Sequence, residues 1–212
     1  GGGFDEVERA VRLLVRQPAC AHFVSQKIAT YFVGDAPPPA LVDAMARTFR
    51  RTDGDIADVL RTLFESREFD SSLGAKFKDP MHYVISAVRL AYDGRPITNE
   101  RPIVNWLNAQ AEPLFGHSTP DGYALTESAW ASSGQISRRF EIARTIGGGN
   151  AGLFDTEDGA RGSGGFPKFS SRLFYEGVEP YLSKTTLAAL DKAASPQEWN
   201  AFLLASPEFN YR

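Results

Sequence analysis

The sequence has few of the residues from which disulfides and metal sites are built. Cys20 is the only cysteine among 212 residues, so neither an intrachain disulfide nor a cysteine-based metal site can form. The histidines, His22, His82 and His117, lie far apart, and a zinc site would need the fold to gather them. A chain of this length buries enough apolar surface to fold without such aids. We therefore expect neither metal nor cofactor.

The sequence also lacks a basic cluster and a long apolar run. It carries 23 Lys and Arg against 26 Asp and Glu, for a net charge of −3, and the two signs are mixed along the chain. A nucleic-acid partner is not expected, because binding it would need basic residues gathered on one face. No stretch of 18 apolar residues occurs, so no transmembrane segment is expected either. The oligomeric state stays open.

Apolar residues recur at helical spacing along most of the chain. From Phe4 to Arg16 the spacing of Val7, Val11 and Leu14 predicts a helix with one buried face. The strongest helical pattern begins after Asp55, a good N-cap residue. Further helices are expected over residues 18–33, 41–50, 80–92, 98–110, 136–146, 184–190 and 196–205.

No segment alternates apolar and polar residues, so the predicted class is all-α, an irregular orthogonal bundle of many helices. We expect 1–212 to fold either as one helical domain or as two lobes, 1–95 and 96–212.

Residues 147–166 are rich in glycine and show no period, which predicts a long loop with few apolar anchors. Gly147, Gly149 and Gly152 spell G-x-G-x-x-G, but the dinucleotide-binding motif needs a strand before it and a helix after it. The acidic cluster of Asp155, Glu157 and Asp158 does not have the spacing of a calcium loop. We interpret the segment as a solvated loop.

The stretch "PLFGHSTPDGY", residues 113–123, is the densest in chemistry-bearing side chains. Thr119-Pro120-Asp121-Gly122 has the composition of a type I turn. One interpretation is a turn and no more. The other is a binding site in which His117, Asp121 and Tyr123 face a groove lined by Phe115 and Trp130. Lys76, Lys78, Arg89 and Arg139 are further candidates for lining a polar groove, and we place Arg139 with the binding residues.

Six segments, in this order, resemble the bacterial family of unknown function called DUF1800: "QPACAHFVSQKIATYFV", "PPPALVDAMARTFRRTDGDIADVLRTLFESREF", "KFKDPMHYVISAVR", "PLFGHSTPDGY", "AWASSGQISRRFEIA" and "LLASPEF". The resemblance implies the C-terminal portion of a longer, frequently exported bacterial protein. It implies no established activity. His117 and Tyr123 stand where the family commonly has Pro and Trp, which weakens a role for either side chain.

These observations predict a non-catalytic binding or scaffold module that binds a partner protein or an extracellular polymer. A periplasmic or secreted location is expected from the resemblance alone. The alternative is part of a hydrolase. No G-x-S-x-G or other catalytic motif in this sequence has the context it needs, so the catalytic acids of such a hydrolase would lie mostly in a missing N-terminal region. The identity of catalytic residues stays open.

Overall fold

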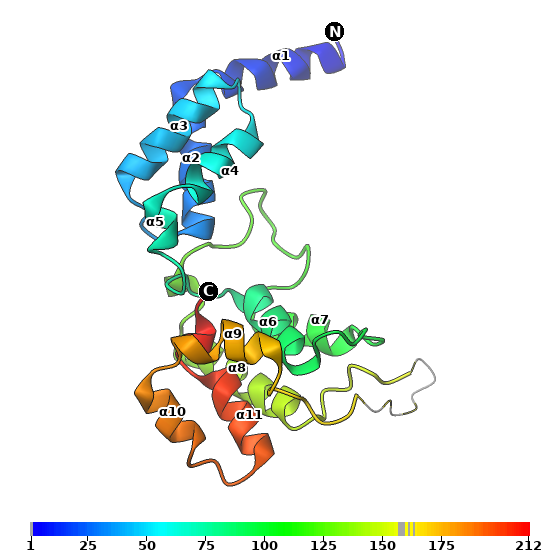
Figure 1. The fold of residues 1–212 in the computed structure, drawn as a ribbon. Helices are drawn as coiled ribbons and strands as arrows, with labels where there is room; N and C mark the ends of the chain where they lie inside the picture. Colours follow the sequence, from blue (N-terminus) through cyan, green and yellow to red (C-terminus); the bar gives the residue numbers. More distant parts are fainter. Residues whose placement is uncertain (1, 157–159, 161, 163) are drawn as a thin grey trace. The chain divides into compact units, whose positions relative to one another are not determined.

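The computed structural model describes residues 2–156, 160, 162 and 164–212 (Figure 1). Within these residues the regular elements are helices, and an isolated bridge of extended backbone joins Phe77 to Tyr211. The predicted all-α class is confirmed.

Two compact units make up the chain, Gly1–Lys76 and Phe77–Arg212. They do not coincide with the expected lobes 1–95 and 96–212, because the helix over residues 80–92 packs into the core of the second unit. The number of domains stays a prediction.

In the first unit, three of the helices pack their apolar faces together in one core. Pro18 and Pro39 occupy first-turn positions, where a missing N–H costs nothing. Asp55 caps its helix by accepting a hydrogen bond from the Asp58 N–H, as predicted. The helices are α1 (Phe4–Val15), α2 (Pro18–Phe32), α3 (Pro39–Arg51), α4 (Ile56–Phe64) and α5 (Arg67–Asp70). The core residues are Ala21, Ala29, Val33, Leu41, Val42, Met45, Ala46, Phe49, Val59 and Leu63.

The predicted buried face of the first helix is wrong. Val7, Val11 and Leu14 are exposed, and α1 contains no buried residue. Only its last residue, Val15, packs against the core of the first unit. The period was identified correctly, but no other helix of the first unit covers this face.

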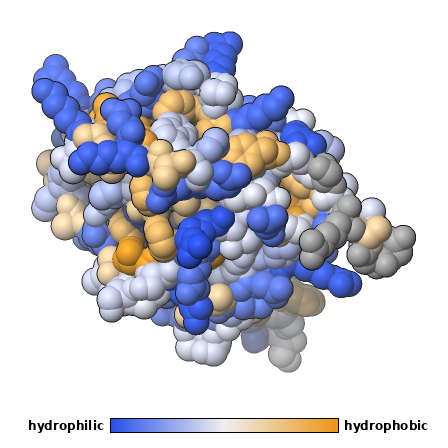
Figure 2. Space-filling model, turned by 90° about the horizontal axis from the view of Figure 1, so that it is seen from below, coloured by the Kyte–Doolittle hydropathy of each residue, from blue (hydrophilic) through white to orange (hydrophobic). Residues whose placement is uncertain are grey.

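The second unit surrounds a larger core to which nearly every one of its helices contributes. Its α-helices are α6 (Pro80–Tyr92), α7 (Arg101–Ala109), α8 (Ser133–Gly147), α9 (Arg172–Gly177), α10 (Lys184–Leu190) and α11 (Pro196–Ala205). Short 3₁₀ turns lie at η1 (Glu127–Ala129), η2 (Glu179–Tyr181) and η3 (Glu208–Asn210). On the face drawn in Figure 2, hydrophobic residues reach the surface in patches between hydrophilic ones.

Helix α8 buries only part of its apolar stripe, and one expectation for the second unit, the loop with few apolar anchors, needs correction. Helix α8 buries Arg139, Ile142, Ala143 and Ile146, whereas Ile136 and Phe140 are partly exposed. The Gly-rich segment also has apolar anchors, since Ala151 and Leu153 are buried in the core. The Leu153 carbonyl accepts hydrogen bonds from the N–H groups of Thr98 and Asn99. Glu157 and Asp158 lie outside the described residues.

Candidate functional site

The stretch from Pro113 to Tyr123 forms a loop whose backbone is fixed by small and cyclic residues. The Gly122 N–H faces the Thr119 carbonyl at 3.5 Å, and Gly122 has a φ of 75°. Gly116 lies so close to Pro113 that a Cβ would approach the proline ring to 2.5 Å. The loop therefore keeps a defined path although most of it is exposed.

The polar side chains of this loop bond to one another. The Thr119 hydroxyl donates to the Asp121 carboxylate, and the His117 Nδ1 lies 3.0 Å from the Thr119 carbonyl oxygen. The same His117 nitrogen is 3.9 Å from Asp121 Oδ1. These groups are occupied by local contacts, which is the arrangement of a stabilised turn.

Phe115 differs from the other loop residues. Its side chain is fully exposed, at 103% of the reference value, and its backbone has a φ of 56°. Left-handed backbone at a non-glycine residue costs roughly 1 to 2 kcal/mol. The adjacent Leu114 is also exposed, at 43%. The loop thus presents two neighbouring apolar side chains to solvent.

Tyr123 and Trp130 anchor the loop at its base. The Tyr123 hydroxyl donates to the Pro113 carbonyl at 2.7 Å and so closes the loop. The Trp130 Nε1 donates to the Ala124 carbonyl at 2.8 Å, and its side chain is buried. The ring of Tyr123 contacts those of His117 and Trp130, with centroids 4.8 and 6.2 Å away. The structure therefore brings His117, Asp121, Tyr123 and Trp130 together, with Phe115 pointing to solvent.

Arg139 lies in the protein interior, with only 1% of its surface exposed. Its Nη1 donates to Asn210 Oδ1 at 2.8 Å, and its Nη2 donates to the Lys78 carbonyl at 2.6 Å. The guanidinium also lies over the rings of Phe77 and Tyr83. Burial lowers the pKa of Arg139 to about 10, so it stays charged at neutral pH. Its contacts are those of a structural cation that joins α8 to the segments around Lys78 and Asn210.

Lys78 is a second buried basic side chain beside Arg139. Its Nζ donates to the Phe209 carbonyl at 2.7 Å and lies 3.9 Å from the centroid of the Phe209 ring. Burial and the charge of Arg139 lower the pKa of Lys78 to about 7. Of the basic residues suggested by sequence to share a groove, these two do meet, but in the interior. Lys76 is bonded instead to Asp35 within the first unit.

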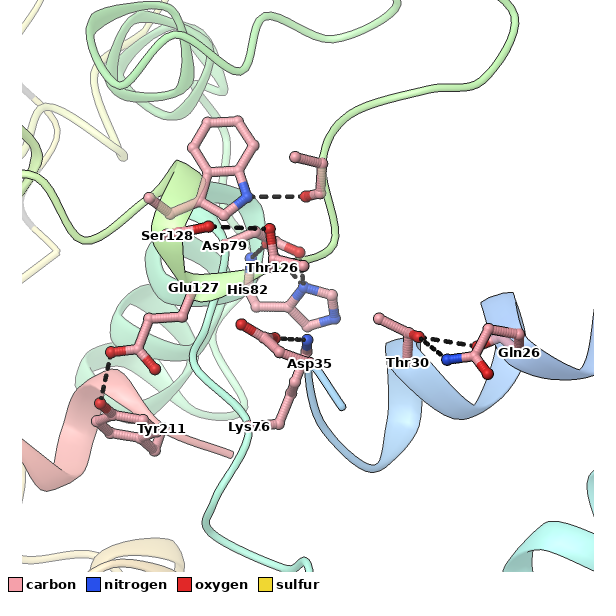
Figure 3. Close-up of polar contacts among 12 residues, drawn as sticks. Gln26, Thr30, Asp35, Lys76, Asp79, His82, Thr126, Glu127, Ser128 and Tyr211 are labelled. Atoms are coloured by element: carbon pink, nitrogen blue, oxygen red, sulfur yellow. Dashed lines mark hydrogen bonds and ion pairs between the residues drawn. The ribbon is translucent and has the colours of Figure 1, made fainter. Parts of the chain in front are cut away.

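An acidic pair lies at the N-terminus of α6. Asp79 accepts from the His82 N–H at 2.8 Å and bonds to its Nδ1 at 2.7 Å (Figure 3). Glu112 Oε2 accepts from the Met81 N–H at 2.8 Å. Two carboxylates thus face the partial positive charge of one helix end.

The two carboxyl groups of this pair titrate differently. Burial and the nearby Asp79 raise the pKa of Glu112 to about 7. Burial acts to raise the pKa of Asp79 as well, but the hydrogen bonds from His82 outweigh it and hold that pKa below its usual value. A carboxyl that protonates near neutrality beside one that stays ionised is an acid–base arrangement known from enzymes.

Sequence reasoning identified part of this interior cluster. Asp79 before Pro80 was recognisable as a helix cap. Glu112 was missed, because it follows α7 in an irregular turn and no period or motif marks it. No group of three His, Cys, Asp or Glu side chains in the described part of the chain is arranged to hold a metal ion.

Fold and site together define an all-helical protein with an exposed apolar loop tip and a buried ionic cluster. A family model described as "Protein of unknown function (DUF1800)" matches residues 1–211. The chain belongs to this family. No curated protein and no solved structure matches the chain. No helix within the described residues is both long and apolar enough to cross a membrane.

Proposed function

We propose that this protein is a non-catalytic binding module, and that it inserts Leu114 and Phe115 into an apolar pocket of a partner protein. The observation that carries the proposal is the full exposure of Phe115 on a loop whose backbone is held by hydrogen bonds. Aromatic residues are enriched at protein interfaces and supply much of the binding energy there. A fixed backbone reduces the entropy lost on binding.

A protein fits this surface better than a polysaccharide does. Sugar hydroxyls need hydrogen-bonding side chains beside an aromatic ring, and those of His117, Thr119 and Asp121 already bond to one another. The apolar pair Leu114 and Phe115 matches a hydrophobic pocket instead. We place the interaction outside the cytoplasm of a bacterium, as the sequence resemblance implies.

Site-specific photo-crosslinking tests this function. Phe115 is replaced by a photoreactive phenylalanine analogue, and the protein is irradiated in cells of the bacterium that encodes it. A matched variant carries the analogue at Phe23, another exposed phenylalanine. We expect one defined protein adduct from position 115 and not from position 23. Adducts to polysaccharide, or identical adducts from both positions, would contradict the proposal.

A second candidate function, hydrolysis, is favoured by the acidic pair at the start of α6. Glu112 would act as the acid and Asp79 would remain ionised, as their diverging pKa values allow. This candidate requires hydrolytic activity that falls at least about 100-fold in Glu112→Gln while the fold is kept. Equal hydrolytic activity in the wild type and in Glu112→Gln would reject hydrolysis as the function.

A further inference from the structure

A groove in the second unit is walled by aromatic side chains that come from separate segments of the chain. It lies between the segment before α9, helix α9 itself and the start of α11, and its volume is about 660 Å³. Pockets of about 300 to 1,000 Å³ with mainly hydrophobic walls and a few polar groups are typical binding sites for small molecules. The apolar wall consists chiefly of Phe169, Phe174, Tyr175, Pro196 and Trp199.

Trp199 is the centre of this aromatic wall. Its ring centroid lies 5.6 Å from that of Phe174 and 6.4 Å from that of Phe169, and both pairs meet edge to face. Tyr175 continues the row, with its ring centroid 5.1 Å from that of Phe174. Trp199 is half-buried and Tyr175 is 52% exposed, so both rings offer surface to a ligand. Because aromatic pairs attract each other beyond the area they bury, the wall favours an aromatic ring over an alkyl chain.

One charged side chain lies among these rings. In the irregular segment before α9, Pro167 and Phe169 are buried. The alternate residues Lys168 and Ser170 are exposed and line the groove, and neither side chain has a hydrogen bond or ion pair with another described residue. No carboxylate is among the described residues of the groove wall. An anion in the groove would therefore meet an ammonium group and a hydroxyl donor without an opposing negative charge.

We propose that this groove binds a small aromatic carboxylate, whose ring packs against Trp199 and Tyr175 and whose carboxylate pairs with Lys168. The aromatic wall selects a flat ring, and the single positive charge selects an anion. The hydroxyl of Ser170 supplies a further donor to the carboxylate. The groove lies wholly within the second unit, and the proposal does not rest on the function proposed for the Phe115 loop.

Titration calorimetry of the whole chain with indole-3-acetate at pH 7 measures this binding. Two further compounds separate the contributions of ring and charge. Indole-3-acetamide keeps the ring but is uncharged, and octanoate keeps the charge but has no ring. We expect indole-3-acetate to bind with a dissociation constant below about 1 mM, and at least about 5-fold more tightly than either of the other compounds.

Matched variants test whether the binding takes place in the groove. Lys168→Gln should weaken the binding of indole-3-acetate at least about 5-fold and leave that of indole-3-acetamide unchanged. Tyr175→Ala should weaken the binding of both indole compounds. The controls Lys184→Gln and Tyr181→Ala change exposed side chains outside the groove and should bind as the wild type does. Circular dichroism checks that each variant keeps the fold, and Lys168→Gln alone decides if Tyr175→Ala does not.

Four results would overturn the proposal. The first is the absence of indole-3-acetate binding at up to about 5 mM. The second is an equal loss of binding in the groove variants and their controls, because the ligand would then bind elsewhere. The third is binding of octanoate as tight as that of indole-3-acetate, which would assign the groove to an alkyl chain. The fourth is equally tight binding of indole-3-acetamide, which would leave the carboxylate without a role.

Discussion

Replacement of Arg139 by methionine tests whether the second unit depends on its buried cation. Methionine retains an apolar stem beside Phe77 and Tyr83 but removes both donated hydrogen bonds. The Lys78 carbonyl oxygen and Asn210 Oδ1 would then be buried acceptors that have lost the guanidinium donor. Each buried hydrogen bond to a charged group contributes about 1.5 to 3 kcal/mol, so we expect the free energy of unfolding to fall by roughly 3 to 5 kcal/mol.

The assay is urea unfolding followed by far-UV circular dichroism at pH 7, where Arg139 is charged. The adjacent Arg138 is the control, because its ion pair with Glu141 is exposed and Arg138→Met should cost under about 1 kcal/mol. Asn210→Ala, alone and combined with Arg139→Met, measures how much of the loss belongs to their hydrogen bond. A loss below about 1 kcal/mol for Arg139→Met, or equal losses for Arg138 and Arg139, would refute the reasoning.

Three further predictions concern the acidic pair, the loop and Lys78. The pKa of Glu112 is raised from 4.5 to about 7, so its favourable contribution is full below pH 4.5 and is lost as the pH rises to about 7. The unfolding free energy of the wild type relative to Glu112→Gln should therefore fall by roughly 3 kcal/mol across that range, and a pH-independent difference would contradict this. Asp121→Ala should cost under about 1 kcal/mol and Trp130→Ala roughly 3 to 5 kcal/mol in urea unfolding; equal costs would show that the polar turn is a structural clasp. The pKa of Lys78 is lowered from 10.5 to about 7, so the wild type should gain stability relative to Lys78→Met as pH rises between these values, and a loss would be inconsistent with its burial.

Local patterns predicted the helices and their caps well, because spacing and capping chemistry act within a few residues. Ser183 and Ser195 cap α10 and α11, because each side chain accepts a hydrogen bond from the backbone N–H three residues later, as their sequence context indicates. Helix α7 begins at Arg101 and not at Thr98, with Pro102 in its first turn as that proline requires.

Tertiary placement was predictable only in part. The period of α1 identified its apolar face correctly, but a period does not say whether the same chain supplies a covering surface. Arg139 reads as a surface residue beside Arg138, and its burial depends on the carbonyl of Lys78 and the side chain of Asn210, both distant in sequence. Glu112 acquires its raised pKa from burial and, to a lesser extent, from the charge of Asp79, and the fold alone produces both surroundings.

The binding function of the loop is tested most directly by titration calorimetry with the partner identified by crosslinking at position 115. The account predicts that Phe115→Ala weakens the affinity at least about 30-fold, corresponding to a hot-spot loss of about 2 kcal/mol. The control Phe23→Ala should bind as the wild type does, and both variants should match the wild type in urea unfolding. Unchanged affinity in Phe115→Ala would contradict the central claim.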